Sequence, residues 1–458
     1  MTSSGAILAA IRETAPPGQE PTEATLAKLR ELAISLVSAS GSSLAEYRRY
    51  LSVTDREIQL PEQRVVEYLA GRTVLVTGAS GCIGTALLRQ LYRFRPGRLV
   101  TVDLAPAPAV PGISHCQLDI RNRQALTNLV AGVDPDIVFH QAAQRNPGLA
   151  EKAVHRTVTT NVLGTRNLVE ACAQAGVDHL IFASTGKALR PYTPDIYAAS
   201  KRAAELIVAD TATRGVVRAS AARFTHVVDN AIILDRLRNW CRRGELIRLH
   251  APDAAFYVQS ALESAQLLIV AALSPDSAGL NLHAIRNLDW PVGLLDLAIG
   301  VMAEHGVAPL QITGHDPGYE EQAYPGLYDP MLAGEVSPLI NIFEAPAVQT
   351  SPSPDVDLVV NPVRFSPDVR QHLDNLETTC ANVRGTQPVR AAFDRLSRAL
   401  LDVTLDQVPA DTLCRVARLT QLHRHRLNKA NLLIDDRIRA RVKHDVLPIP
   451  PAAATTLS

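Results

Sequence analysis

The sequence lacks the features that would place it in a special class of protein. Lys+Arg is 46 and Asp+Glu is 46, so the net charge is zero, which argues against a whole-chain electrostatic grip on nucleic acid or anionic membrane. No apolar run approaches the roughly 18 residues that a membrane span needs. The six cysteines form no CxxC pair, which argues against a zinc ribbon or a disulfide framework and favours a reduced, cytoplasmic protein. We therefore expect no metal site, no membrane span and no nucleic-acid partner.

Other absences further narrow the class of protein. Residues 1–20 contain Arg12, Glu13 and Glu20 and have no basic start followed by an apolar block, so we expect no signal peptide. Aromatic residues make up only 4% of the chain, and lysine is scarce, with six among the 46 basic residues. A lysine inside a motif is therefore more informative here than an arginine. Hydrophobic residues at 47% and charged residues at 20% are ordinary for a globular protein.

The 458 residues divide into five predicted regions. The pattern predicts a helical N-terminal extension over 1–70 and alternating strands and helices over 71–348. A segment rich in Pro, Ser and Asp predicts a linker over 349–366. A helical, Arg-rich region over 367–445 and a disordered tail over 446–458 complete the chain.

Short apolar runs in the central region predict the strands of a sheet. They are Thr73 to Val76, Leu99 to Asp103, Cys116 to Ile120, Ile137 to His140, and Leu180 to Ser184. Helical patterns lie between them. Regular alternation of strand and helix predicts an α/β fold with a parallel, doubly wound sheet.

A glycine-rich turn follows the first of these strands. Gly78, Gly81 and Gly84 form a GxxGxxG pattern that leads into an amphipathic helix. Glycine permits a tight turn and a close approach of backbone to a pyrophosphate, and the helix N-terminus offers free N–H groups to it. With a strand before it and a helix after it, the loop predicts a dinucleotide site.

Asp103 lies at the end of the second strand, 19 residues beyond Gly84. At that place a carboxylate accepts hydrogen bonds from the adenosine ribose and repels a 2′-phosphate. No Arg or Lys follows it in 104–110. The pattern favours NAD over NADP, with a helix or turn cap as the structural alternative.

Tyr197 and Lys201 form a second motif, YxxxK. Side chains at i and i+4 share one face of a helix. A phenol has a pKa of about 10, too high for a base at neutral pH, and a nearby ammonium lowers that value. The motif follows the Ser184-Thr185 pair by about a dozen residues, which favours a catalytic pair over chance.

Together these motifs resemble the extended short-chain dehydrogenase/reductases, and most closely the capsular-polysaccharide-type UDP-N-acetylglucosamine 4,6-dehydratase family. The resemblance covers about residues 70–345 and leaves both ends of the chain outside it. It implies a Rossmann-type sheet with a small substrate-binding subdomain and a role in polysaccharide biosynthesis. The helical regions that the pattern predicts flank this part of the chain. The matching stretches are 74–84, 136–143, 160–165, 183–188, 197–205 and, more weakly, 222–224 and 312–314.

The resemblance also implies roles for single residues. Tyr197 would transfer the proton, Lys201 would hold the nicotinamide ribose, Thr185 would hydrogen-bond the reacting hydroxyl, and Lys187 matches a lysine of the family. Asn161 is either a proton-relay residue or a buried structural residue, and His140 is more readily explained as a packed residue. The cofactor would contact Gly78, Ser80, Gly81, Cys82, Ile83, Gly84, Asp103, Asp119, Ile120, Ala142, Ala143, Asn161 and Lys201.

The sequence departs from the family at several of these positions. Gly186 replaces the acid that helps to expel a hydroxyl in the dehydratases, and a glycine cannot transfer a proton. Arg223-Phe-Thr-His-Val227 replaces the Arg-Phe-Gly-Asn-Val of the family, and two arginines that would face a diphosphate are replaced by Ala255 and Asp316. Either other arginines such as Arg223, Arg242 or Arg243 hold a nucleotide sugar, or the substrate is of another kind.

Further alternatives concern an inserted loop and the C-terminal region. Tyr192, in the loop before Tyr197, is a packed or exposed aromatic or else reaches the pocket. The segment 415–443 has seven Arg and two Lys around His423 and His425. It is a solvated helical face or a patch for an acidic partner, and a metal-binding histidine pair is disfavoured because i and i+2 point apart on a helix.

The sequence favours an NAD-dependent oxidoreductase or epimerase that acts on a hydroxyl of a sugar or nucleotide sugar through Tyr197. The alternatives are a nucleotide-sugar 4,6-dehydratase and a non-catalytic NAD-binding protein that engages a partner through its helical ends. We also expect a homo-oligomer.

Overall fold

The computed structural model describes residues 3–107, 110, 112–230, 232–313, 338–383, 385–421 and 424–442. The predicted disordered tail lies outside the described residues. Within the part of the chain that is described, no helix combines the length and the apolar character that crossing a membrane requires.

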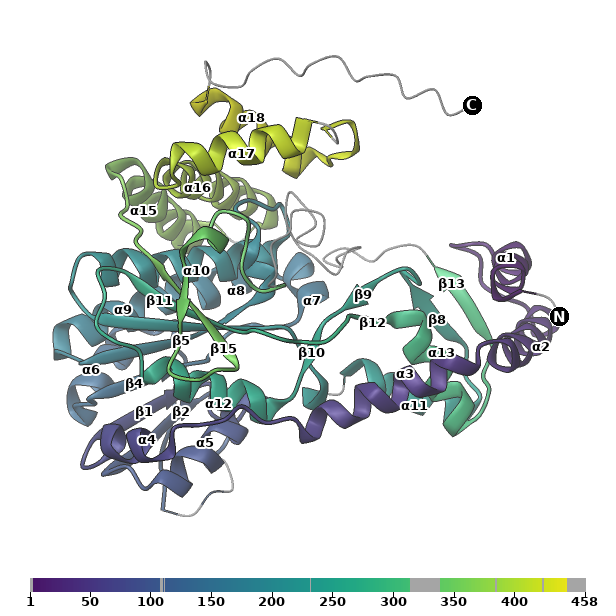
Figure 1. Ribbon diagram of the computed structural model, residues 1–458, viewed down its shortest axis with the longest axis horizontal. Coiled ribbons are helices and arrows are strands. Elements are labelled where there is room, and N and C mark those ends of the chain that lie inside the picture. The colour runs from purple at the N-terminus through teal and green to yellow at the C-terminus, as the bar shows by residue number, and fades with distance from the viewer. Residues whose placement is uncertain are drawn as a thin grey trace.

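A nine-stranded sheet forms the centre of the larger domain (Figure 1). Its strands, from one edge to the other, are β3 (Ser114–Gln117), β2 (Arg98–Asp103), β1 (Thr73–Thr77), β4 (Ile137–His140), β5 (His179–Thr185), β6 (Arg218–Phe224), β11 (Leu280–Ile285), β15 (Val356–Asn361) and β14 (Val348–Thr350). The strands from β3 to β11 are parallel, as predicted, and their central members are buried apolar runs such as Ile137–His140. The strand order reverses between β1 and β4, so the carboxyl ends of these two strands flank the crevice where an open α/β sheet binds its ligand.

Helices cover both faces of this sheet. They are α4 (Glu62–Leu69), α5 (Cys82–Phe94) and α12 (Ala261–Ala272) on one face, and α6 (Arg123–Val133), α9 (Gly164–Ala175) and α10 (Ile196–Thr213) on the other. Two short helices, α7 (Pro147–Lys152) and α8 (Val154–Val158), lead into α9. The apolar sides of both layers join the strands in one large core.

Two predictions about strands are corrected by the structure. The segment 349–366 is not a linker, because it contains β15 and most of β14, which extend the sheet in antiparallel fashion beyond β11. The third strand, predicted over Cys116 to Ile120, begins earlier, at Ser114, and ends at Gln117.

A smaller lobe lies beyond the carboxyl ends of the strands. It contains α11 (Ile232–Arg243), β8 (Ile247–His250), α13 (Leu294–His305) and β13 (Leu310–Thr313). Two short ribbons, β7 (His226–Val227) with β10 (Val258–Gln259) and β9 (Ala255–Phe256) with β12 (Val292–Gly293), connect it to the large domain.

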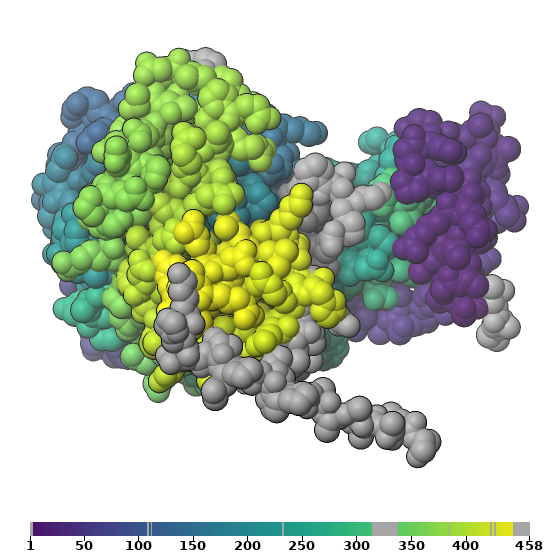
Figure 2. Space-filling view, turned by 90° about the horizontal axis from the view of Figure 1, so that it is seen from above, coloured from purple at the N-terminus to yellow at the C-terminus, as the bar shows by residue number. Residues whose placement is uncertain are grey.

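The N-terminal helices pack on this lobe and complete its core. They are α1 (Ser4–Thr14), α2 (Glu23–Ala39) and α3 (Gly41–Ser52). Helices α3 and α13 approach closely at Gly300, where a β-carbon would lie 2.3 Å from Cβ of Tyr47. Figure 2 shows these helices in purple at the far end of the molecule from the C-terminal ones.

The C-terminal helices cover the face of the large domain that carries α8 and α10 (Figure 1). They are α15 (Pro367–Asn382), α16 (Thr386–Asp406), α17 (Ala410–Gln421) and α18 (Lys429–Arg441). Tyr192 packs against this layer: it is 6% exposed, and its hydroxyl donates to Asp394 of α16.

Candidate functional site

The glycine-rich loop is shaped by close backbone contacts. Gly78 has φ +73°, and a β-carbon there would lie 2.5 Å from the backbone N of Ala142. A β-carbon on Gly84 would lie 2.4 Å from the carbonyl oxygen of Gly78. Gly81 is the N-cap of α5 and supplies no side-chain cap, so the first N–H groups of that helix have no partner within it. This is a cradle that suits a pyrophosphate, the group predicted for it.

Asp103 lies beside this loop at the end of β2. Its carboxylate accepts hydrogen bonds from the backbone N–H of Ser80 at 2.9 Å and of Ala105 at 3.0 Å. Each carboxylate oxygen can accept a second bond, so Asp103 can both shape the loop and bind ribose hydroxyls. The carboxylate of Asp103 can thus cap the turn and bind a ribose at the same time.

Asp119 and Ile120 occupy the next part of the predicted cofactor site. The guanidinium of Arg121 hydrogen-bonds Asp119, with its Nε 2.9 Å from Oδ2, and holds the pKa of that carboxyl below its usual range. Ile120 packs so closely on α9 that a β-carbon on Gly164 would lie 2.8 Å from its Cδ1.

Asn161 is engaged entirely within the protein. Its Nδ2 donates to Oγ of Ser200 at 2.9 Å and to the carbonyl of Gln144, and its Oδ1 accepts from the N–H of Gln144 at 2.7 Å. It lies in a turn of π-helix, Thr159–Leu163, and links that turn to α10. These contacts support its structural role, and Ser200 is the residue just before Lys201.

His140 is a packed residue, as the sequence favours. Its ring bonds Oγ1 of Thr77 at 2.8 Å and of Thr165 at 3.0 Å. Burial, helped by the charge of Lys201, lowers its pKa to about 3, so the ring is neutral.

The catalytic candidates come from two neighbouring elements. Strand β5 ends at Thr185, and helix α10 carries Tyr197 and Lys201 one turn apart. Nζ of Lys201 donates to the carbonyl of Ala183 at 2.7 Å and lies 4.3 Å from the centre of the Phe182 ring. Burial lowers the pKa of Lys201 to about 7, although the charge of Glu205 opposes the shift. Such a perturbed lysine beside a tyrosine, at the carboxyl end of a strand, is typical of an active site.

Lys187 and Gly186 lie directly after Thr185 in a short turn, Gly186–Leu189. The backbone N–H of Lys187 donates to Oγ1 of Thr185 at 3.3 Å. A β-carbon on Gly186 would lie 2.8 Å from Cδ2 of Leu339, which is 2% exposed. A leucine therefore fills the space beside Gly186, the position where the dehydratases carry an acid.

Arg223 cannot hold a diphosphate. This corrects the alternative in which Arg223 binds a nucleotide sugar. It is completely buried, and its guanidinium bonds Glu205 at 2.6 Å and Glu344 at 2.6 Å. Arg243 is largely exposed and lies 3.6 Å from Glu245. Ala255 lies in the β9–β12 ribbon, and Asp316 lies outside the described residues.

Three arginines of the Arg-rich C-terminal segment pair with carboxylates of α16 and α18. Arg424 pairs with Asp435 and Asp436, Arg439 with Asp435, and Arg441 with Asp402 and Asp406. These pairs favour the reading of a solvated helical face over a patch for an acidic partner. His423 lies outside the described residues, and over the parts of the chain that are described no three His, Cys, Asp or Glu side chains are grouped to hold a metal ion.

Sequence patterns missed three groups at this site. Gln141, just after β4, buries both atoms of its carboxamide with no hydrogen-bond partner among the described residues, which suits contact with a ligand. Glu205 accepts from Ser184 at 2.6 Å and thereby ties α10 to the strand end. His226 lies beyond β6 and faces Tyr50 of the N-terminal extension. In the sequence, His226 stood out only because the family has an asparagine at its position. No local pattern indicated a role for Gln141 or Glu205.

Comparison with known proteins assigns the chain to a family. The family described as "Polysaccharide biosynthesis protein" matches residues 74–324, more than half of the chain. The chain belongs to this family. The resemblance found in the sequence is thereby confirmed, and residues before 74 and after 324 lie outside the match.

Individual relatives agree with this assignment. The probable polysaccharide biosynthesis protein EpsC of Bacillus subtilis is 25% identical over 287 residues, which cover 58% of this chain and 47% of that protein. A UDP-N-acetylglucosamine 4,6-dehydratase (inverting) of Campylobacter jejuni is 31% identical over 170 residues, 34% of this chain and 50% of that enzyme. The chain thus spans about half the length of EpsC.

A solved structure confirms the predicted fold. The X-ray structure of Pen from Bacillus thuringiensis superposes with a TM-score of 0.53 at 19% identity, covering 65% of this chain and 89% of that one. This likeness concerns the fold alone.

Proposed function

We propose that the protein is an NAD-dependent enzyme that oxidises a hydroxyl of a nucleotide sugar, as an oxidoreductase or epimerase. The observation that carries the proposal is the buried Lys201, one helical turn from Tyr197 and beside the strand that ends at Thr185. The family match and the named activity of the Campylobacter relative support the substrate class.

The cofactor contacts follow from the crevice. Gly78, Gly81 and Gly84, with the N-terminus of α5, would hold the pyrophosphate of NAD, and Asp103 would hold the adenosine ribose. A carboxylate at that place favours NAD over NADP. When bound, NAD supplies a hydride acceptor for the carbinol carbon.

Proton transfer falls to the side chains of the protein. Thr185 would orient the substrate hydroxyl, and Tyr197 would take its proton as the carbon is oxidised. The ammonium of Lys201 stabilises the phenolate of Tyr197 and so lowers the pKa of that phenol. The carbonyl of Ala183 fixes the lysine for this role.

The surroundings of Gly186 favour oxidation or epimerisation over dehydration. Expelling a hydroxyl needs a group that protonates it, and the space beside Gly186 contains the apolar side chain of Leu339. A 4,6-dehydratase is the second candidate, because a relative with that name is 31% identical over 170 residues. In that case Lys187 is the remaining candidate for the proton donor.

Mass spectrometry of the nucleotide released by denaturing the purified protein tests the proposal, followed by NMR analysis of UDP-N-acetylglucosamine and UDP-glucose after incubation with it. We expect retained NAD or NADH and a product of unchanged mass or a keto sugar. A product that has lost one water would support the dehydratase instead. A protein that neither contains nor binds a nicotinamide cofactor would end the proposal.

The homo-oligomer, the cytoplasmic location and the individual site residues stay predictions. Size-exclusion chromatography with light scattering would test the first, and substitution of the named residues would test the last.

A further inference from the structure

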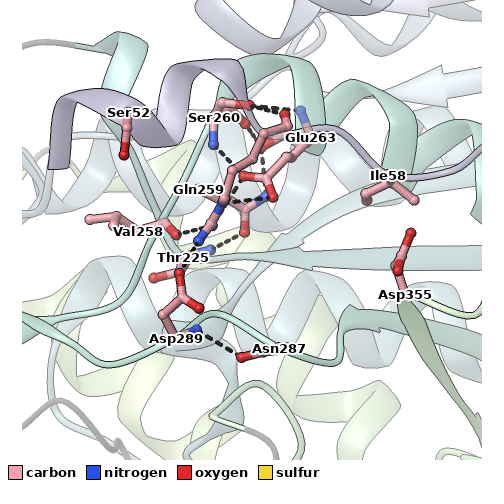
Figure 3. A network of polar contacts seen from close by, with 12 residues as sticks. Ser52, Ile58, Thr225, Val258, Gln259, Ser260, Glu263, Asn287, Asp289 and Asp355 are labelled. Carbon is pink, nitrogen blue, oxygen red and sulfur yellow. Dashed lines mark hydrogen bonds and ion pairs between the residues drawn. The ribbon is translucent and has the colours of Figure 1, made fainter. Parts of the chain in front are cut away.

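The N-terminal extension reaches the edge of the crevice. The hydroxyl of Tyr50, near the end of α3, lies 3.5 Å from Nε2 of His226. Arg56 donates to the carbonyl of Val258 at 2.8 Å and pairs with Glu263 at 3.1 Å. Figure 3 shows Val258 and Glu263 in a network of polar contacts. Val258 is the strand partner of His226. Residues 50–56 therefore hold the β7–β10 ribbon at two points.

This ribbon lies beside the catalytic candidates. Strand β7 follows β6 directly, and Phe224, the last residue of β6, is the strand partner of Thr185. Farther along the chain, Asp229 accepts a hydrogen bond from the backbone N–H of Ala261 at 2.6 Å, and burial, followed by the charge of Asp229, raises the pKa of Cys82 in the glycine-rich loop to about 11. Along the chain, His226 thus lies between the strand partner of Thr185 and a residue whose charge acts on the cofactor loop.

The ring of His226 is fixed and uncharged. The ring of Phe256 packs on it with centroids 4.7 Å apart. Burial, together with the charge of Lys187, lowers the pKa of His226 to about 4. A neutral imidazole has one donor and one acceptor nitrogen. Tyr50 faces Nε2, and among the described residues none hydrogen-bonds Nδ1.

A neutral group of this kind suits a sugar hydroxyl better than a diphosphate. A hydroxyl both donates and accepts, so it can satisfy either tautomer of the ring, whereas a diphosphate requires a donor and is best bound by a cation. Arg223, three residues before His226 in the sequence, is fully occupied by two glutamates, so the cation that acts on His226 is Lys187.

We propose that His226 is a substrate-binding residue whose Nδ1 hydrogen-bonds a hydroxyl of the sugar, and that Tyr50 of the N-terminal extension is the positioning residue that orients its ring. The inference rests on the proposed function of the site. It gives the N-terminal extension, which lies outside the family match, a part in the substrate pocket.

Steady-state kinetics of the NAD-loaded protein with UDP-N-acetylglucosamine and UDP-glucose tests this role. The variants are H226F, which keeps a ring without hydrogen-bonding atoms, H226N, which restores them, and Y50F. Loss of one neutral hydrogen bond should raise KM about tenfold in H226F and about threefold in Y50F, with kcat changed less. H226N should lie closer to the wild type than H226F does.

Tyr47→Phe is the matched control, since Tyr47 is buried on the same helix and its hydroxyl bonds Arg238 and lies 3.3 Å from His305. KM should be unchanged in Y47F. If the wild type turns over a sugar nucleotide and both H226F and Y50F keep its KM, the inference is wrong while the proposed function stands. If the wild type neither binds nor converts either compound, the proposed function fails and the inference fails with it. Should H226F not fold, the comparison of Y50F with Y47F decides alone.

Discussion

At Gly84 one added β-carbon is enough to disturb the cofactor loop. It would lie 2.4 Å from the carbonyl oxygen of Gly78 and 2.7 Å from that of Ala79, so the backbone would have to shift. We expect G84A to bind NAD about tenfold more weakly or worse, equivalent to about 1.4 kcal/mol or more. Isothermal titration calorimetry would measure the affinity.

Gly132 in α6 provides the control for that substitution. A β-carbon there meets nothing within 4 Å, and alanine is favoured over glycine inside a helix by about 1 kcal/mol. G132A should bind NAD like the wild type and be slightly more stable. Equal NAD affinity in G84A and G132A would contradict the predicted cradle.

Leu339 and Gly186 should be energetically coupled. The β-carbon of an aspartate at 186 would press on Cδ2 of Leu339, so G186D should lower the free energy of unfolding by about 1–3 kcal/mol. Leu339→Ala opens the space and relieves that strain. Urea denaturation of both single variants and the double variant should therefore show less than the sum of their effects, and strict additivity would be inconsistent with the contact.

Residue-scale features were predictable where the signal is local. The glycine-rich loop and the Tyr197–Lys201 pair occupy fixed spacings along the chain, so the sequence alone indicated both. The ion pairs of Arg223 were not predictable, because its partners Glu205 and Glu344 lie 18 and 121 residues away in the sequence. A sequence shows that an arginine is present but does not show which carboxylates surround it.

At the scale of elements, the buried cluster of Arg223, Glu205 and Glu344 joins β6, α10 and the segment after residue 338. All three side chains are nearly or completely buried. Removing one partner leaves an uncompensated buried charge, which typically costs about 3–5 kcal/mol. R223M and E344Q should lower the free energy of unfolding by about that amount, measured by urea denaturation.

Arg243 supplies the matched control for the cluster. Its side chain is 71% exposed, and its pair with Glu245 spans 3.6 Å. Such surface pairs contribute about 0–1 kcal/mol, so R243A should be nearly neutral. If R223M proves as mild as R243A, the cluster does not have the stabilising role assigned to it.

Some strands could be predicted from the sequence, and others could not. Ile137 to His140 matches β4 because a buried parallel strand is a short apolar run. The run in β15, Val356–Asn361, was hidden among prolines and aspartates, and its pairing with β11 joins residues about 75 positions apart. Such long-range antiparallel pairing leaves little local signal.

At the scale of the whole molecule, both ends of the chain brace the candidate site. The N-terminal extension holds the β7–β10 ribbon through Tyr50 and Arg56. The C-terminal layer holds the start of α10: Glu151 accepts from the N–H of Ile196 at 2.8 Å and pairs with Arg390 of α16. The sequence left the purpose of both ends open, and these contacts give each a supporting role beside the helix that carries Tyr197 and Lys201.

Buried neutral histidines should make the fold sensitive to acid. His140 and His283 are fully buried, and burial lowers the pKa of each to about 3. In the unfolded chain each titrates near pH 6.5, so between these values the unfolded state binds more protons and stability falls as the pH falls. We expect the urea midpoint to drop between pH 7 and pH 4.

His283→Gln tests this account, because the longer amide can reach the position of Nε2, which bonds Ser274, and cannot be protonated. One extra proton bound by the unfolded state corresponds to a slope of about 1.4 kcal/mol per pH unit. The variant should have a shallower dependence than the wild type below pH 6. An identical slope would mean that His283 does not contribute to the acid sensitivity.

The most direct test of the whole account compares Tyr197→Phe with the wild type. NAD affinity and turnover of UDP-N-acetylglucosamine and UDP-glucose would be measured on both proteins. The account predicts unchanged NAD binding and a loss of turnover of about 100-fold or more in Y197F, since a positioned general base contributes about that much. Turnover that survives in Y197F at the wild-type rate would contradict the role assigned to this residue and the mechanism built on it.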